Sequence, residues 1–137
     1  MSYLVDTNVI SELRKGRRCN PGVASWFAEV ASEEIYLSAL TLGEIRKGIE
    51  NIRRRDEPAA EALEDWFQEL EASHSDHILP VDQTIAEQWG RFNVPASLPV
   101  IDSLLAATAS IHGLILVTRN LKDVERTGVD CLNPFSV

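Results

Sequence analysis

Tyr3-Leu4-Val5-Asp6-Thr7-Asn8, near the start of the chain, places a carboxylate directly after a short apolar run. Tyr3 to Val5 is typical of a buried β-strand, and Val9 to Lys15 has the pattern of a helix. Asp6 is therefore expected at the carboxyl end of a strand. In parallel α/β sheets these ends share one edge, and ligands bind in the crevice outside it. Acids from distant segments can converge there.

Four more strands are predicted, mostly separated by helical patterns. They are Ile35 to Ser38, His77 to Val81, Leu114 to Thr118 and Val129 to Leu132. The helical patterns cover Val23 to Ala31, a stretch from Thr41, a stretch from Ala59 and a stretch after Pro99 that stops at Gly113. The turn at Asp56-Glu57-Pro58 separates two of these helices, which are expected to pair as a hairpin. The alternation predicts an α/β fold with a largely parallel sheet.

Size and composition indicate one domain over residues 1–137, because 137 residues with 45% hydrophobic content can bury one substantial core. No run approaches the roughly 18 apolar residues of a membrane span. Asp6 also interrupts the N-terminal apolar run where a signal peptide needs its hydrophobic region. We therefore expect a cytoplasmic protein with no membrane partner. Cys19 and Cys131 lie far apart in different contexts, which argues against a disulfide or a zinc site.

The net charge of −8 argues against nucleic acid as a partner until the charges are counted by segment. Residues 56–87 carry ten acids and no Lys or Arg, so the rest of the chain has 13 bases against 11 acids, a balance of +2. Nine of the bases lie between Arg14 and Arg55. A local basic face therefore stays open, with solvated loop and helix-end charges as the alternative.

Four acids follow apolar runs close to expected helix starts: Asp6, Glu44, Asp102 and Asp123. Each has a structural explanation. Asp6 can cap the first helix, Thr41-Leu42-Gly43-Glu44 has the form of a capping box, and the other two suit a first helical turn. Together they suggest a shared metal site. Oxygen ligands without Cys or His favour Mg²⁺, with Mn²⁺ as the alternative, over zinc.

Four segments in order resemble PIN-domain proteins, especially the VapC toxins and the related FitB subgroup. They are Leu4 to Leu13, Ser38 to Ile45, Ile101 to Ala109 and Thr118 to Asp123. The resemblance implies a PIN α/β/α sandwich in which the four acids form a divalent-metal site for hydrolysis of RNA phosphodiester bonds. Thr7, Asn8, Thr118 and Asn120 match supporting polar positions. The resemblance also implies a toxin of a type II toxin–antitoxin pair, a VapB-like antitoxin, a homodimer, and contact with operator DNA through the antitoxin.

Two other functions remain open at this point. One is a non-catalytic partner subunit of a DNA-binding antitoxin–toxin repressor. The other is a phosphatase of the haloacid-dehalogenase type with Asp6 as nucleophile, although such enzymes need a second aspartate where this chain has Asn8.

Several other side chains can be interpreted as functional or as structural. Arg46, Lys47 and Arg119 are candidate phosphate contacts or rim charges. The stripes Val23-Trp26-Phe27-Val30 and Leu63-Trp66-Phe67-Leu70 are candidate walls of a partner groove, with core packing as the default. Structural roles are expected for His74, His77 and His112, and packing roles for Trp26, Trp66 and Trp89.

Overall fold

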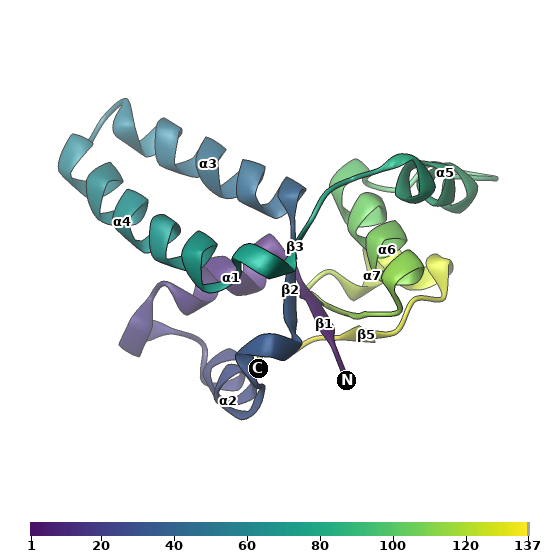
Figure 1. Cartoon of the computed structure of the whole chain (residues 1–137), viewed down its shortest axis with the longest axis horizontal. Helices are drawn as coiled ribbons and strands as arrows, with labels where there is room; N and C mark the ends of the chain where they lie inside the picture. Colours follow the sequence, from purple (N-terminus) through teal and green to yellow (C-terminus); the bar gives the residue numbers. More distant parts are fainter. Residues whose placement is uncertain (137) are drawn as a thin grey trace.

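A five-stranded parallel sheet forms the centre of the computed structural model, which describes residues 1–136 (Figure 1). Its strands are β1 (Tyr3–Val5), β2 (Ile35–Ser38), β3 (Ile78–Leu79), β4 (Ile115–Val117) and β5 (Cys131–Leu132). They lie in the order β3-β2-β1-β4-β5, and every neighbouring pair is parallel. The predicted parallel sheet is confirmed, and β1 is its central strand.

Helices cover both faces of this sheet (Figure 1). They are α1 (Thr7–Leu13), α2 (Pro21–Glu29), α3 (Ala39–Arg53), α4 (Glu57–Ser73), α5 (Gln83–Phe92), α6 (Val100–His112) and α7 (Leu121–Val124). Within residues 1–136, none of these helices combines the length and apolar character needed to cross a bilayer.

Alternation along the strands divides the core into two clusters. Val5 and Val117 pack with residues of α1 to α4, whereas their neighbours Leu4 and Leu116 pack with residues of α6 and α7. Successive side chains of a strand point to opposite faces, so one short strand supplies both clusters. Full burial of each such side chain contributes about 1.5–3 kcal/mol. The α/β/α sandwich is therefore confirmed.

The hairpin of α3 and α4 is also confirmed, and it extends beyond the sheet (Figure 1). Arg53 lies between the two helices and donates to Glu50, Glu57, Glu61 and Glu64. Arg46 donates two hydrogen bonds of 2.7 Å to Glu64. Its guanidinium also stacks over Phe67, 5.1 Å from the ring centre. These contacts join the two helices along their exposed side.

The predicted capping box at Thr41 to Glu44 is wrong. The helix begins earlier, because the hydroxyl of Ser38 accepts from Leu40 N at 3.1 Å and caps α3. Thr41 lies inside the helix and is buried. Glu44 consequently stands one turn into α3, and its carboxylate is not needed by the helix start.

Two further differences have local causes. The strand predicted from His77 to Val81 shortens to Ile78–Leu79, because Pro80 has no N–H to continue the ladder.

Helix α5 was not predicted. Asp82 caps it by accepting from Ile85 N at 2.9 Å, and Ile85 is its buried anchor. The sequence did contain a signal for the start of this helix, because Asp82 is a typical N-cap residue and stands three residues before the apolar Ile85.

The C-terminal segment is fastened to the start of α2. Asn20 donates to Ser136 O and accepts from Ser136 N at 3.0 and 2.9 Å. Gly22 N donates to the Ser136 hydroxyl at 3.1 Å. A Cβ added at Gly22 would lie 2.3 Å from Pro134 O, so only glycine allows this approach.

Gly22→Ala should therefore displace the C-terminal segment and lower the free energy of unfolding by about 1–3 kcal/mol, as overpacking does. Thermal melting of both proteins measures the effect. Gly90→Ala in α5 is the matched control, because its added Cβ meets nothing within 4 Å. Equal melting temperatures for Gly22→Ala and wild type would contradict this account of the segment.

Candidate metal centre

The sheet order changes direction between β1 and β4. After β1 the chain adds β2 and β3 on one side, and it then returns to place β4 on the other side. Such a switch point leaves a crevice at the carboxyl ends of the two strands, where ligands of open α/β sheets bind. Asp6 follows β1 and Thr118 follows β4, so both lie at this crevice.

Asp6 is 4% exposed and is held by three donors. Thr118 Oγ1 donates to Oδ2 at 2.7 Å, Thr7 N donates to Oδ1 at 2.6 Å, and Asn8 Nδ2 donates to Oδ2 at 3.2 Å. Burial raises the pKa of Asp6, the hydrogen bonds from Thr118 and Thr7 lower it, and the charge of Glu44 raises it. The net effect is a raised pKa. The carboxylate is thus fixed in place while its charge remains poorly compensated.

Glu44 reaches the same place from α3. The Thr7 hydroxyl donates to Glu44 Oε1 at 2.5 Å, while the Thr7 backbone N–H donates to Asp6, which caps α1. Thr7 therefore ties together two acids that are 38 residues apart in sequence, at positions 6 and 44.

Asp102 and Asp123 stand in the first turns of α6 and α7. Burial, together with the charges of Asp6 and Asp123, raises the pKa of Asp102 to about 6. A hydrogen bond from the Asn120 side chain acts in the opposite direction. The four predicted acids thus form a continuous series of electrostatic neighbours, in the order Glu44, Asp6, Asp102, Asp123.

A pocket of about 290 Å³ opens at these acids. We call it the carboxylate pocket; its lining residues are Asp6, Thr7, Asn8, Glu44, Ile101, Asp102 and Asn120. Thr118 is buried and hydrogen bonds to Asp6. Asp123 does not line the pocket but hydrogen bonds to Asp102. Sequence reasoning missed Ile101, the apolar member of the wall. Its position directly before Asp102 was the only signal.

The start of α6 is held from outside by α5. Trp89 Nε1 donates to the Ser103 hydroxyl at 3.0 Å, and that hydroxyl donates to Pro99 O at 2.7 Å. Ser103 is fully buried and adjoins Asp102 in sequence. Trp89 therefore has a packing role, as expected, and helps to fix the helical turn that carries Asp102.

The donor set fits a hard divalent cation. The pocket is lined by carboxylate, hydroxyl and amide oxygens, without Cys or His. Over residues 1–136, however, no three acidic, His or Cys side chains are close enough to form a complete metal cage. Magnesium suits this arrangement, because it keeps several waters and needs only one or two direct carboxylates. A bound cation would also relieve the repulsion that raises the pKa of Asp102.

The three basic residues that were candidates for phosphate contacts have different surroundings. Arg46 is held by Glu64 and Glu50 and covers Phe67, so its proposed phosphate contact is not supported. Arg119 stacks on Phe135 at 4.5 Å, and its backbone N donates to Asn8 Oδ1 at 3.4 Å. Lys47 is exposed and has no acidic partner within residues 1–136.

The other expected roles fit the structure. His74 Nδ1 pairs with Leu70 O, and His77 Nδ1 pairs with Ile35 O, so both rings serve packing. Cys19 and Cys131 are free thiols.

The two apolar stripes contribute both to a groove and to the core. Leu63 and Trp66 of the second stripe line a narrow groove of about 100 Å³ beside Glu44. Val23 and Phe67 are core residues.

The comparisons with known proteins agree with this geometry. The PIN domain family model matches residues 3–129. The chain is 31% identical to the toxin FitB of Neisseria gonorrhoeae, over 96% of this chain and 97% of FitB. It is 30% identical to the VapC ribonuclease Y4jK of Sinorhizobium fredii, over 96% of each chain. A chain in the structure of FitAB bound to an IR36 DNA fragment superposes with a TM-score of 0.87 at 26% identity, covering 98% of this chain and 96% of that one. The protein therefore belongs to the PIN-domain family, among its VapC- and FitB-type toxins.

Proposed function

We propose that this protein is the single-domain toxin of a type II toxin–antitoxin pair and a Mg²⁺-dependent endoribonuclease. The observation that carries the proposal is that Glu44, Asp6 and Asp102 line one pocket at the switch point of the sheet, with Asp123 next to Asp102. The names of its relatives, a toxin and a VapC ribonuclease, support the same activity.

In this proposal the four acids hold the metal, and Mn²⁺ can replace Mg²⁺. A divalent cation bound there supplies an activated water and stabilises negative charge on the phosphate and the leaving oxygen. Thr118, Thr7 and Asn8 fix the position of Asp6. Thr7 also orients Glu44, and Asn120 supports Asp102. Such supporting hydrogen bonds hold ligands in place and tune their charge.

The proposed protein partners are a VapB-like antitoxin and a second copy of the toxin. The groove beside Glu44 suits an apolar segment of the antitoxin, because Leu63 and Trp66 line it near the carboxylate pocket. Arg14 stands at the same groove and can pair with an acidic residue of that segment.

A second function rests on a different observation. FitAB, which resembles this chain in structure, was solved bound to a DNA fragment. This chain can therefore accompany its antitoxin on operator DNA as a partner subunit in repression. The two functions are compatible, and RNA cleavage distinguishes them.

The phosphatase alternative is not supported. Asn8 stands where the second aspartate of that enzyme class is needed, and its amide donates to Asp6 at 3.2 Å. An amide in this role holds the carboxylate and cannot supply a proton to a leaving group.

Asp6→Asn should reduce Mg²⁺-dependent RNA cleavage by at least about 100-fold, because it removes a ligand charge while keeping the side chain's shape. Cleavage of an RNA panel, with and without chelator, measures this. Asp65→Asn on the exposed face of α4 is the matched control and should cleave like wild type. Undiminished cleavage by Asp6→Asn would refute the assignment.

Asp102→Asn should stabilise the metal-free protein at pH 7.5. The raised pKa means that the unfolded chain releases the Asp102 proton from about pH 4, whereas the folded chain keeps it until about pH 6. Above pH 6 the ionised Asp102 therefore lowers the free energy of unfolding by its full amount, and below pH 4 it does not lower it at all. After allowance for solvent screening, the gain is about 1 kcal/mol, or about 2–4 °C in melting temperature.

Melting curves in EDTA at pH 4 and pH 7.5 test this prediction. The difference between Asp102→Asn and wild type should shrink at the lower pH, and added Mg²⁺ should stabilise wild type more than the variant. The exposed Asp130→Asn serves as the control. A variant that melts below wild type at pH 7.5 would contradict the proposed repulsion.

A further inference from the structure

Helix α3 contains two interior glycines that the fold itself does not require. A Cβ added at Gly43 or Gly48 would meet no atom within 4 Å. Glycine in the middle of a helix lowers its stability relative to alanine. Since no neighbouring part of residues 1–136 needs the space, the bare backbone is available for close approach by another molecule.

Both glycines line a trough of about 530 Å³ along α3. Its wall includes Gly43, Glu44, Lys47, Gly48, Asn51 and Ile101. Glu44 and Ile101 also line the carboxylate pocket, so the trough runs directly into it. From Glu44 to Asn51 the helix rises about 10 Å, which leaves room for a ligand that continues beyond the carboxylates.

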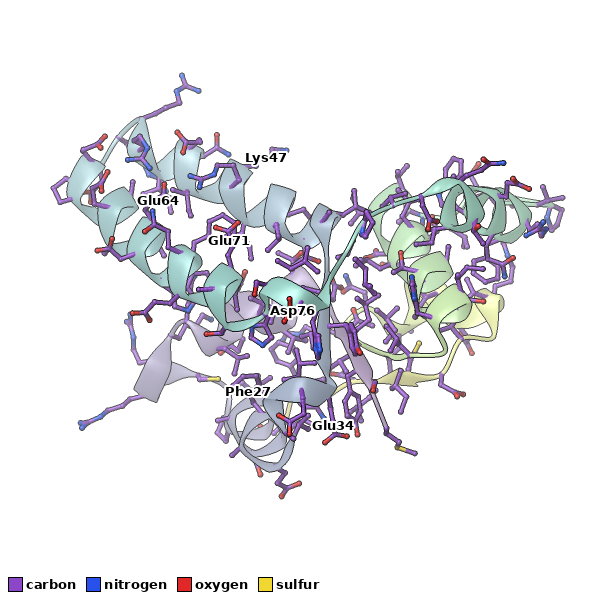
Figure 2. All side chains as sticks on the ribbon, in the orientation of Figure 1. Phe27, Glu34, Lys47, Glu64, Glu71 and Asp76 are labelled. Atoms are coloured by element: carbon purple, nitrogen blue, oxygen red, sulfur yellow. The ribbon has the colours of Figure 1, made fainter. Side chains whose placement is uncertain are left out.

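Lys47 provides the positive charge of this trough. It lies three residues after Glu44, on the same helical face, and has no acidic partner within residues 1–136. Figure 2 shows Lys47 on the edge of α3 that points away from α4, whereas Glu64 lies between the two helices. The neighbouring cations Arg46 and Arg53 are held there by glutamates. Lys47 is therefore the cation of α3 that faces the trough.

We propose that this trough carries the RNA strand on one side of the bond to be cleaved. Lys47 contacts a backbone phosphate, Asn51 hydrogen bonds farther along, and Gly43 and Gly48 let the sugar–phosphate chain lie close to the helix. A free cation beside a carboxylate centre suits a polyanion, since Lys47 offsets the repulsion from Glu44. A second copy or an apolar peptide gains nothing from that charge. The inference rests on the proposed ribonuclease function and assigns its substrate path.

Lys47→Ala and Gly48→Leu test the path on the full-length protein. Binding of a fluorescent single-stranded RNA, followed by anisotropy in Ca²⁺ buffer, should weaken about fivefold to tenfold in each variant. For Lys47→Ala the slope of log affinity against log salt should fall by about 0.7, the value for one contact to a single strand. Gly48→Leu should melt at or above the wild-type temperature, because leucine favours the helix and its Cβ meets no atom within 4 Å.

Gly90→Leu separates the path from general effects on folding and chemistry. Gly90 in α5 has the same open surroundings and lies outside the trough. This variant should therefore bind RNA and hydrolyse bis(p-nitrophenyl) phosphate like wild type.

The outcomes distinguish the path from the function on which it rests. If the wild-type protein cleaves RNA, and both variants bind and cleave RNA as well as it does, the proposed path is wrong and the ribonuclease function stands. Weaker RNA binding by both variants, with no cleavage by wild type, overturns the ribonuclease function and supports the path as a binding site. A change of oligomeric state in Gly48→Leu with unchanged RNA affinity shows that a second copy fills the trough, and this also overturns the proposal.

Discussion

The hydrogen bond from Thr118 to Asp6 joins the ends of two adjacent parallel strands across 112 residues of sequence. It exists because β4 returns to lie beside β1 at the point where the sheet changes direction. Asp6 begins α1, and Thr7 extends the same network to Glu44 on α3. The polar site at the edge of the sheet thus depends on strand order, and residues far apart in sequence become neighbours through it.

The site concentrates negative charge where burial makes that charge unfavourable. Asp6 is almost fully buried, and burial together with acidic neighbours raises the pKa of Asp102 to about 6. The fold tolerates this repulsion because the apolar clusters on both faces of the sheet supply the bulk of its stability. A strained group of like charges that a cation would relieve is typical of a functional site. The open trough along α3 then gives an anionic strand access to that group.

Much of this arrangement could be predicted from the sequence. Short apolar runs followed by acids predicted the strands and their parallel direction, and the four acids predicted a shared site, because the carboxyl ends of parallel strands lie at one edge of a sheet. The order of the strands was not predicted, since it depends on tertiary packing. The role of Thr41 could not be predicted, since Ser38 and Thr41 are equally good caps and only tertiary packing chose Ser38. Nor could the sequence separate Arg46 from Lys47. Adjacent residues on a helix point in different directions, and only the position of α4 decides which one is neutralised.

Anomalous diffraction from crystals soaked in Mn²⁺ tests the central claim most directly, because Mn²⁺ takes the same oxygen ligands as Mg²⁺. The account predicts an anomalous peak in the carboxylate pocket, at about 2.0–2.3 Å from an oxygen of Asp6 or Asp102. It also predicts that the Asp6→Asn crystal loses this peak under the same soak. Crystals soaked at pH 7.5 that show no peak in the carboxylate pocket, at a Mn²⁺ concentration that supports cleavage, would contradict it.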